Sequence, residues 1–245
     1  MKSVLPSVWS VPNRFNERLG ETAGRQRAME HEGQLLLILH RVPEPGLADR
    51  EHVFFWRNEQ GDWQTSGRGP GLLALKTLLD EYETRVAALE SELTAAEEGD
   101  DVERFFEVLR AVQPILRAAR NLRGVLQTAR ETVDDKAVIS LRDQALENER
   151  DTELLLAEAK HALDYAIARQ AQIQVDVSNH LARSGARLNL LVSIFLPLTA
   201  LGAVFGMNLS SGLEVTAAPY LFWGVAALGL VTGFLLRGRI GSAPS

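Results

Sequence analysis

The chain of 245 residues contains no cysteine and no excess of positive charge. Without cysteine it has no disulfide, no thiolate metal site and no cysteine nucleophile. Its net charge of -6 argues against nucleic acid as a main partner, because a basic surface is missing. The histidines are scattered, without the HExxH spacing of a metal-dependent hydrolase: His31, His40, His52, His161 and His180. We therefore expect neither an enzyme nor a resident cofactor.

Charge is nearly absent from the C-terminal part of the chain. Between Arg187 and Glu214 lie 26 uncharged residues, and between Glu214 and Arg237 lie 22. A helix rises about 1.5 Å per residue, so 22 residues reach roughly 33 Å and cross a hydrocarbon core of about 30 Å. Two buried helices of a soluble protein are the alternative, which is disfavoured because neither run has a polar face. We expect a first span at 188–208, an outer loop at 209–218 and a second span at 219–236.

Basic residues flank the two expected spans on one side only. Arg183 and Arg187 precede the first span, Arg237 and Arg239 follow the second, and the loop between them contains no Lys or Arg. Basic flanks stay in the cytoplasm, so both termini are expected there, including the tail 237–245. The first residues contain no apolar core of a cleaved signal. The sequence thus predicts a multi-pass protein of the cell (inner) membrane, with the lipid bilayer as a partner.

Both expected spans carry a pair of glycines four residues apart. These are Gly202 with Gly206, and Gly229 with Gly233. Small residues at this spacing let helix backbones approach closely in lipid, so the two pairs predict close packing between the spans.

The N-terminal part is expected to be a small α+β cytoplasmic domain. Residues 1–33 are rich in turn formers and charge and are expected to be irregular. Within residues 34–70, two apolar runs of strand length, at 34–42 and 52–56, and a turn at Gly61 predict a small antiparallel sheet.

Helical periodicity begins at Gly71 and predicts cytoplasmic helices over residues 71–132. In the first helix, apolar residues recur at alternating steps of four and three: Leu75, Leu79, Tyr82, Val86, Leu89 and Leu93. A second helix from Asp101 to about Thr132 has a similar seam: Phe105, Leu109, Val112, Leu116 and Leu122. Pro114 lies inside this helix and predicts a kink or a break there.

A long stalk helix over 133–187 is expected to continue into the first span, because no proline occurs between Pro114 and Pro197. Thr132 and Asp135 are spaced as a capping pair at its start. An apolar seam follows one face: Val138, Leu141, Ala145, Leu156, Ala159, Leu163, Ala166, Ile173, Val177, Ser184, Leu188, Val192, Phe195, Thr199 and Ala203. Two arrangements bury such a seam, either several copies around a central axis or an antiparallel hairpin within one chain.

The first expected span ends in Gly206-Met207-Asn208 and contains Pro197-Leu198-Thr199. In these residues the chain resembles the CorA family of magnesium channels. The signature of that family is Gly-Met-Asn at the outer end of a pore-lining helix that contains a Pro-Leu-Thr element. The tripeptide stands at the end of the first of two C-terminal spans, after a long helix, which makes the match specific. The resemblance extends over roughly residues 100 to 240.

The resemblance implies a predominantly α membrane protein that forms a homopentamer and conducts divalent metal ions, Mg²⁺ first. Mg²⁺ gives up its water shell reluctantly, and a ring of neutral asparagine amides binds that shell while still releasing the ion. Asn208 would form this ring, and Gly206 would let the backbone turn beside it. The pore-lining residues would be Leu188, Val192, Phe195, Leu196, Thr199 and Ala203.

Acidic residues are candidates for further contacts with the ion. Glu214 is the only acid on the expected outer side, where it would concentrate cations or be a solvated loop residue. Members of the resembled family sense internal Mg²⁺ through acidic residues at subunit interfaces, which makes Mg²⁺ an expected regulator as well as the substrate. Composition alone nominates Glu97, Glu98, Asp100, Asp101, Asp134 and Asp135 for this role.

Two rival functions stay open at this point. Relatives with altered signatures move Zn²⁺, Co²⁺ or Ni²⁺, so a transporter of these ions is one alternative, although the intact Gly-Met-Asn favours Mg²⁺. A membrane-anchored coiled-coil scaffold that conducts nothing is the other. An anchor does not require Asn208 in its particular context, which argues against the scaffold.

Overall fold

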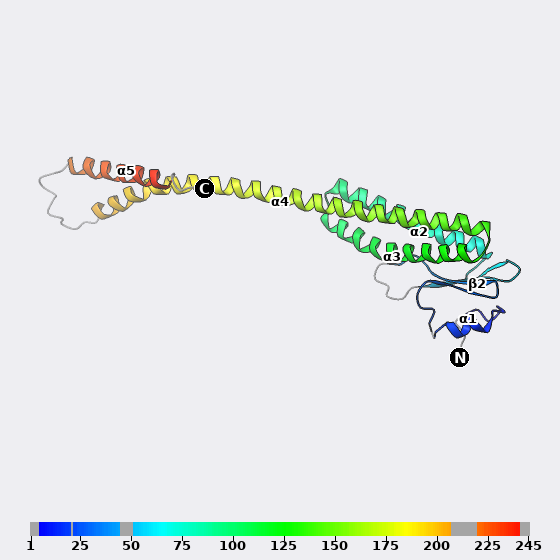
Figure 1. The fold of residues 1–245 in the computed structure, drawn as a ribbon. Coiled ribbons are helices and arrows are strands. Elements are labelled where there is room, and N and C mark those ends of the chain that lie inside the picture. The colour runs from blue at the N-terminus through cyan, green and yellow to red at the C-terminus, as the bar shows by residue number, and fades with distance from the viewer. Residues whose placement is uncertain (1–4, 21, 45–50, 207–219, 241–245) are drawn as a thin grey trace. The chain divides into compact units, whose positions relative to one another are not determined.

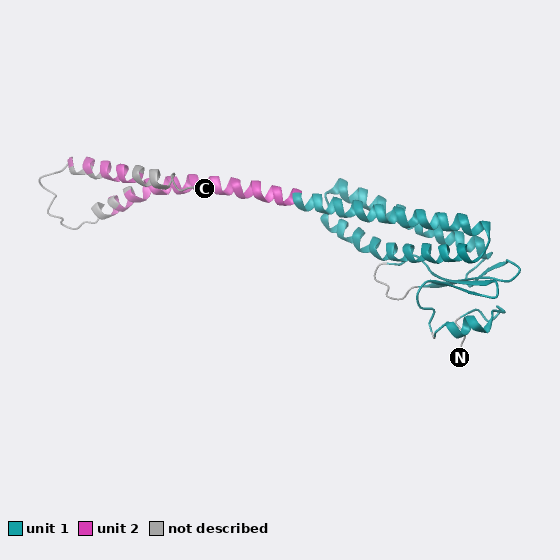
Figure 2. Cartoon of the chain, viewed as in Figure 1, with its two compact units in different colours: residues 1–168 teal, residues 169–245 magenta. Residues whose placement is uncertain are grey.

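The structure is a computed structural model, and it describes residues 5–20, 22–44, 51–206 and 220–240. The chain divides into two compact units, unit 1 (residues 1–168) and unit 2 (residues 169–245), shown in Figure 2. The elements are α1 (Asn13–Arg18), β1 (Arg27–His31), β2 (Gln34–His40), β3 (His52–Arg57), β4 (Trp63–Thr65), α2 (Gly71–Gly99), α3 (Val102–Thr132), α4 (Lys136–Gly206) and α5 (Tyr220–Ile240), labelled in part in Figure 1.

Unit 1 contains the antiparallel sheet that the sequence predicts, with strand order β1-β2-β3-β4. Every residue of β2 is buried, because both faces of the sheet are covered. Successive side chains of a strand point to opposite faces. Leu35 and Leu37 therefore share a core with the helices of this unit, whereas Leu36 and Ile38 share a second core with α1. Figure 1 shows α1 and the helices on opposite faces of the sheet.

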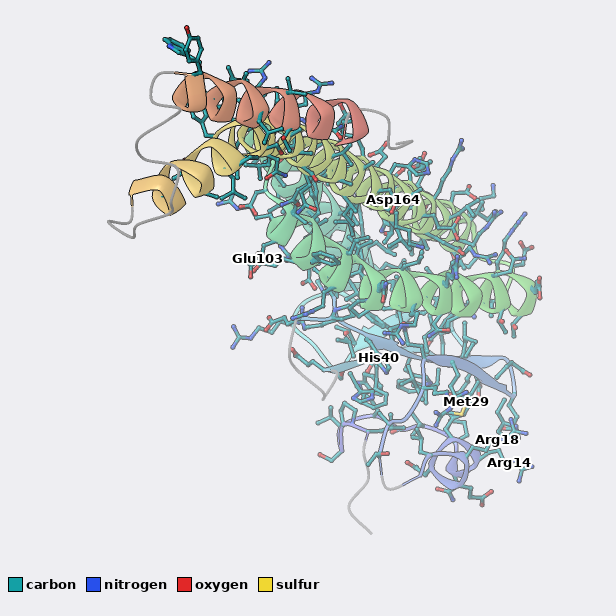
Figure 3. All side chains as sticks on the ribbon, turned by 90° about the vertical axis from the view of Figure 1, so that its left-hand side faces the viewer. Arg14, Arg18, Met29, His40, Glu103 and Asp164 are labelled. Atoms are coloured by element: carbon teal, nitrogen blue, oxygen red, sulfur yellow. The ribbon has the colours of Figure 1, made fainter. Side chains whose placement is uncertain are left out.

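The segment 1–33 contains α1 and β1, so the expectation that it is irregular is wrong. Its apolar residues Leu5, Trp9 and Phe15 are buried on the outer face of the sheet, where the Trp9 ring lies 5.8 Å from that of Trp56. Figure 3 shows Met29 between the sheet and α1. They follow one another at intervals of 4, 6 and 14 positions, so no single strand or helix period predicts their burial.

Helices α2 and α3 follow the predicted seams, except that Leu109 of α3 is only partly buried and Val108 is buried instead. All six seam residues predicted for α2 are buried. The turn between the helices is short, with Asp100 in a left-handed conformation (φ 53°) and the Asp101 carboxylate accepting hydrogen bonds from the backbone at the start of α3. α3 continues through Pro114, so the helix does not break there.

Helix α4 begins at Lys136, after a cap formed by Asp135. The Oδ1 atom of Asp135 accepts a hydrogen bond of 3.0 Å from the Ala137 amide. The Thr132 hydroxyl instead donates to the Thr128 carbonyl within α3. The expected capping pair of Thr132 with Asp135 is therefore wrong, because α3 ends at Thr132 itself.

Up to Ala166, α4 is packed against α2 and α3 of the same chain. Its buried residues are Val138, Leu141, Ala145, Asn148, Glu149, Thr152, Leu155, Ala159, Leu163 and Ala166. This part of the expected seam is thus covered within one chain, and Leu155 rather than Leu156 is fully buried. The seam also passes through polar residues. The Asn148 amide is satisfied by donating to the Leu79 carbonyl of α2 at 2.9 Å.

In unit 2 the described helices are α4 from Arg169 onward and α5. In the part of the chain that the structure describes, no helix is long and apolar enough to cross a membrane. Residues 207, 208 and 219 of the two expected spans, and the expected outer loop 209–218, lie outside the described residues.

Candidate functional site

The predicted pore-lining residues lie on the C-terminal part of α4, in unit 2. Leu188, Val192, Phe195 and Leu196 are between 49% and 65% exposed, and Thr199 and Ala203 are exposed as well. A helix turns about 100° per residue, so these six positions fall within about 100° of the helix circumference. We call this face the 188–203 stripe.

The same face of α4 is exposed further toward the N-terminus. Ile173, Val177 and Leu181 are each more than half exposed, and every residue from 167 to 189 is exposed. Apolar surface left in water costs about 25 cal/mol per Å², and long exposed apolar stripes mark interaction surfaces. The described residues of this chain do not cover the face.

Helix α5 packs against the opposite face of α4. A Cβ added to Gly233 would lie 3.1 Å from the Cα and 3.3 Å from the carbonyl oxygen of Ile194. Ile194 and its partly buried neighbours Leu190 and Pro197 lie roughly 180° around α4 from the 188–203 stripe. Packing of α5 therefore leaves the stripe open.

The two glycine pairs behave differently. Gly229 and Gly233 of α5 are both buried, and the close approach of Gly233 to α4 confirms the predicted packing. A Cβ on Gly202, in contrast, would have no atom within 4 Å. Gly233 therefore brings α5 close to α4 within one chain, whereas Gly202 makes no such contact there.

Thr199 is the polar member of the stripe. Its hydroxyl donates a hydrogen bond of 2.8 Å to the Phe195 carbonyl one turn earlier. A hydroxyl satisfied by its own helix can enter apolar surroundings at little cost. Its oxygen still has lone pairs that can accept hydrogen bonds from water around an ion.

The signature tripeptide follows directly from this helix. Pro197 lies inside α4, which ends at Gly206. Met207, Asn208 and Glu214 lie outside the described residues. Helix α4, which carries the stripe, therefore extends to Gly206, the residue before Met207.

The six acidic candidates lie at two helix junctions of unit 1. Glu97, Glu98, Asp100 and Asp101 lie at the α2–α3 junction, and Asp134 and Asp135 lie at the α3–α4 junction. The 31 residues of α3 separate the two groups by about 45 Å. Among the residues that the structure describes, no three or more His, Cys, Asp or Glu side chains gather as metal ligands. One chain thus does not bring the two groups together.

Asp135 is held by several partners from the sheet. The Trp63 indole donates to its Oδ2 atom at 3.0 Å, and Arg57 forms an ion pair with it at 3.6 Å. Burial alone would raise the pKa of Asp135. The hydrogen bonds from Trp63 and Ala137 and the charge of Arg57 outweigh burial and lower that pKa. Asp135 therefore ties the sheet to the start of α4.

Strand pairing reveals one cluster that the linear sequence conceals. His40 and His52, treated above as scattered, are register partners in the β2–β3 pair. Each histidine lies at one end of an apolar run. Aligning the two runs as an antiparallel hairpin would have predicted that His40 and His52 are opposite each other.

The comparison with protein families decides the identity of the chain. The model of the family described as CorA-like Mg²⁺ transporter protein matches residues 73–237, more than half of the chain. The chain belongs to this family. It is accordingly a divalent-cation transporter of the CorA family.

Two solved structures resemble this CorA-family chain. The full-length CmaX protein is 19% identical, with a TM-score of 0.57 over 93% of this chain and 82% of that one. The complete CorA magnesium transporter from Methanocaldococcus jannaschii is 18% identical, with a TM-score of 0.52 over 90% of this chain and 80% of that one. At these identities the likeness concerns the fold alone. Among curated protein sequences, none matches the chain.

Proposed function

We propose that this CorA-family transporter is a Mg²⁺ channel of the cell (inner) membrane, built from five copies with both termini in the cytoplasm. The observation that carries the proposal is the 188–203 stripe, an exposed face of α4 opposite the face that α5 covers. Around a fivefold axis, the stripes of five copies would face one another and line a pore. The five copies of α5 would then lie outside the ring formed by the five copies of α4.

The residues of the stripe suit conduction of a hydrated dication. Leu188 and Leu196 would form apolar rings that close the pore by excluding water, and Thr199 would supply a polar ring. Five Asn208 amides at the outer mouth would bind the water shell of Mg²⁺ without holding the ion as tightly as carboxylates. A membrane potential of 100 mV drives a dication inward by about 4.6 kcal/mol.

Mg²⁺ inside the cell would also regulate the channel by bridging acidic residues of neighbouring copies. Asp101 and Asp135 already serve as helix caps, which leaves the exposed Glu97, Glu98 and Asp134 as better candidates. Flux should fall between micromolar and many-millimolar Mg²⁺ on the cytoplasmic side. Equal flux under both conditions would overturn this regulation and leave the channel proposal intact.

The decisive experiment measures ion flux into liposomes that contain the purified full-length protein. Asn208→Ala removes one amide from every copy, so Mg²⁺ uptake should be lost while the assembled mass is unchanged. Asn189→Ala is the matched control, because Asn189 is exposed on α4 beside the stripe. Glu214→Gln should lower uptake less, and mainly at low ionic strength, since a loop charge acts through screened attraction.

Parallel assays with Zn²⁺ and Co²⁺ separate the alternatives. Faster uptake of Zn²⁺ or Co²⁺ than of Mg²⁺ by wild type would assign the chain to transport of those ions. An Asn208→Ala protein that assembles and transports like wild type would refute the asparagine ring. Absence of flux of any ion in wild type would favour the membrane-anchored scaffold.

A further inference from the structure

Two histidines meet at the end of the β2–β3 pair. His40 and His52 are register partners, and opposite residues of an antiparallel pair carry their side chains on the same face. Their ring centroids lie 4.6 Å apart, with the planes at 89°. His40, labelled in Figure 3, is only 4% exposed, whereas His52 is half-buried. One ring is thus anchored in the interior and the other is reached by solvent.

Both imidazoles direct their Nε2 atoms at one backbone oxygen. The Gly24 carbonyl oxygen lies 3.0 Å from Nε2 of His40 and 3.1 Å from Nε2 of His52. Gly24 has a left-handed backbone (φ 70°), which turns the chain shortly before β1. Gln26 holds this turn, because its side chain accepts from the His40 amide and donates to the Ala118 carbonyl of α3. The three atoms are therefore positioned by two strands and a braced turn.

Two imidazole nitrogens and a carbonyl oxygen form a donor set for a transition metal. Zinc binds imidazole nitrogen at about 2.0 to 2.1 Å, so neighbouring ligand atoms of a tetrahedral centre lie about 3.3 Å apart. The two N–O separations of 3.0 and 3.1 Å must open by a few tenths of an ångström, and each ring must turn so that Nε2 points at the metal instead of the carbonyl oxygen. On binding, the proton of each neutral imidazole moves from Nε2 to Nδ1, which leaves a lone pair for the metal.

We propose that His40, His52 and the Gly24 carbonyl bind one transition-metal ion of the Zn²⁺, Co²⁺ and Ni²⁺ class. Water would complete the coordination on the side of His52. Mg²⁺ is a poor fit, because it demands six oxygen ligands in octahedral geometry. The site lies in unit 1, whereas the 188–203 stripe lies in unit 2, so the inference goes beyond the proposed Mg²⁺ path.

Nearby charges set the expected affinity. Arg27 donates to the Ala23 carbonyl beside Gly24 at 3.0 Å, so its positive charge opposes a bound cation. Arg41, next to His40, is offset by ion pairs with Glu51 at 3.1 Å and Glu81 at 2.7 Å. The charge of Arg27 should therefore make the site bind a cation more weakly than a site surrounded by carboxylates.

The test is isothermal titration of tag-free full-length protein in detergent with Zn²⁺ or Ni²⁺, in the presence of excess Mg²⁺. Wild type should bind one ion per chain. His52→Gln should weaken binding by at least about tenfold, because loss of even an outer-shell partner costs about ten- to a hundredfold. His180→Gln is the matched control on exposed α4, and Asn208→Ala should also bind like wild type.

Each outcome decides the proposal. X-ray absorption of the loaded wild type should show imidazole scatterers around the metal, and these should decrease in His52→Gln. His40→Gln removes the other imidazole ligand, provided that the buried position tolerates replacement. Wild-type binding by a folded His52→Gln protein, or equal loss in His180→Gln, would overturn the site. The histidine pair would then only hold the Gly24 turn, and the channel proposal would be unaffected.

Discussion

The backbone of Gly233 in α5 lies against the backbone of Ile194 in α4, so that a Cβ at Gly233 would be 3.1 Å from the Ile194 Cα. A larger residue at Gly233 must push the helices apart. We expect Gly233→Val to lower the stability of the full-length protein by about 1 to 3 kcal/mol, as overpacking does. Thermal unfolding in detergent, followed by loss of the monodisperse species, measures this effect.

Gly224 provides the control for that substitution. It lies in the same helix, but a Cβ added to it would have no atom within 4 Å. Gly224→Val should therefore unfold at nearly the wild-type temperature. Equal destabilisation by the two substitutions would show that helix propensity, rather than contact with Ile194, accounts for the loss.

Asp135 should make the stability of the protein depend on pH in the acid range. Its pKa is lowered in the folded state, so its stabilising contribution is complete above the unfolded value of 3.8 and is lost as pH falls through the lower folded pKa. Asp135→Asn should lower the free energy of unfolding by about 1 to 2 kcal/mol at neutral pH. This difference from wild type should shrink below pH 3.8.

Thermal unfolding of the full-length protein between neutral and strongly acidic pH checks this prediction. Asp134→Asn, at the exposed neighbouring position, should cost less than about 0.5 kcal/mol at neutral pH. A difference between Asp135→Asn and wild type that stays constant down to the lowest pH would contradict the role of the charge.

Two glutamates of α4 share Arg120 of α3 but differ in burial. Glu149, whose side chain is 11% exposed, also pairs with Arg123, whereas Glu153 is 45% exposed and pairs with Arg120 at 2.6 Å. Glu149→Ala should lower the free energy of unfolding by about 1 to 3 kcal/mol, because it removes a largely buried carboxylate that pairs with both Arg120 and Arg123. Glu153→Ala should cost no more than about 1 kcal/mol, as exposed ion pairs do. Denaturation of both variants in parallel tests the contrast, and equal losses would contradict it.

The exposed face of α4 between Ile173 and Leu181 should contribute to assembly. Val177→Lys would place a charge from every copy into the proposed contact between copies, where desolvation and mutual repulsion disfavour it. We expect native mass measurement to show smaller species for this variant. Asn179→Lys adds the same charge about 160° around the helix and should leave the mass unchanged. Identical masses for both variants would exclude this part of α4 from the interface.

Local patterns predicted the seams of α2 and α3, because the apolar residues of each seam recur every three or four positions. Such residues are buried by any apolar surface that packs against the helix. The same method skipped Asn148 and Thr152, which are buried in α4 although they are polar. Burial of Asn148 depends on the Leu79 carbonyl, 69 positions away in the sequence. A carbonyl on a neighbouring helix leaves no trace in the sequence pattern around Asn148.

By itself the sequence determined the long α4, the small sheet and the CorA family, because proline spacing, apolar runs and the Gly-Met-Asn signature are local properties. Only the tertiary structure decided which parts of the α4 seam are covered. α2 and α3 cover it as far as Ala166, and α5 approaches the far side of α4 at Ile194. The tertiary structure also decided that α1 and β1 form, and that His40 and His52 both contact the Gly24 carbonyl. These features depend on contacts between segments that are distant in the sequence. The free energy of such a contact cannot be assigned to either segment alone.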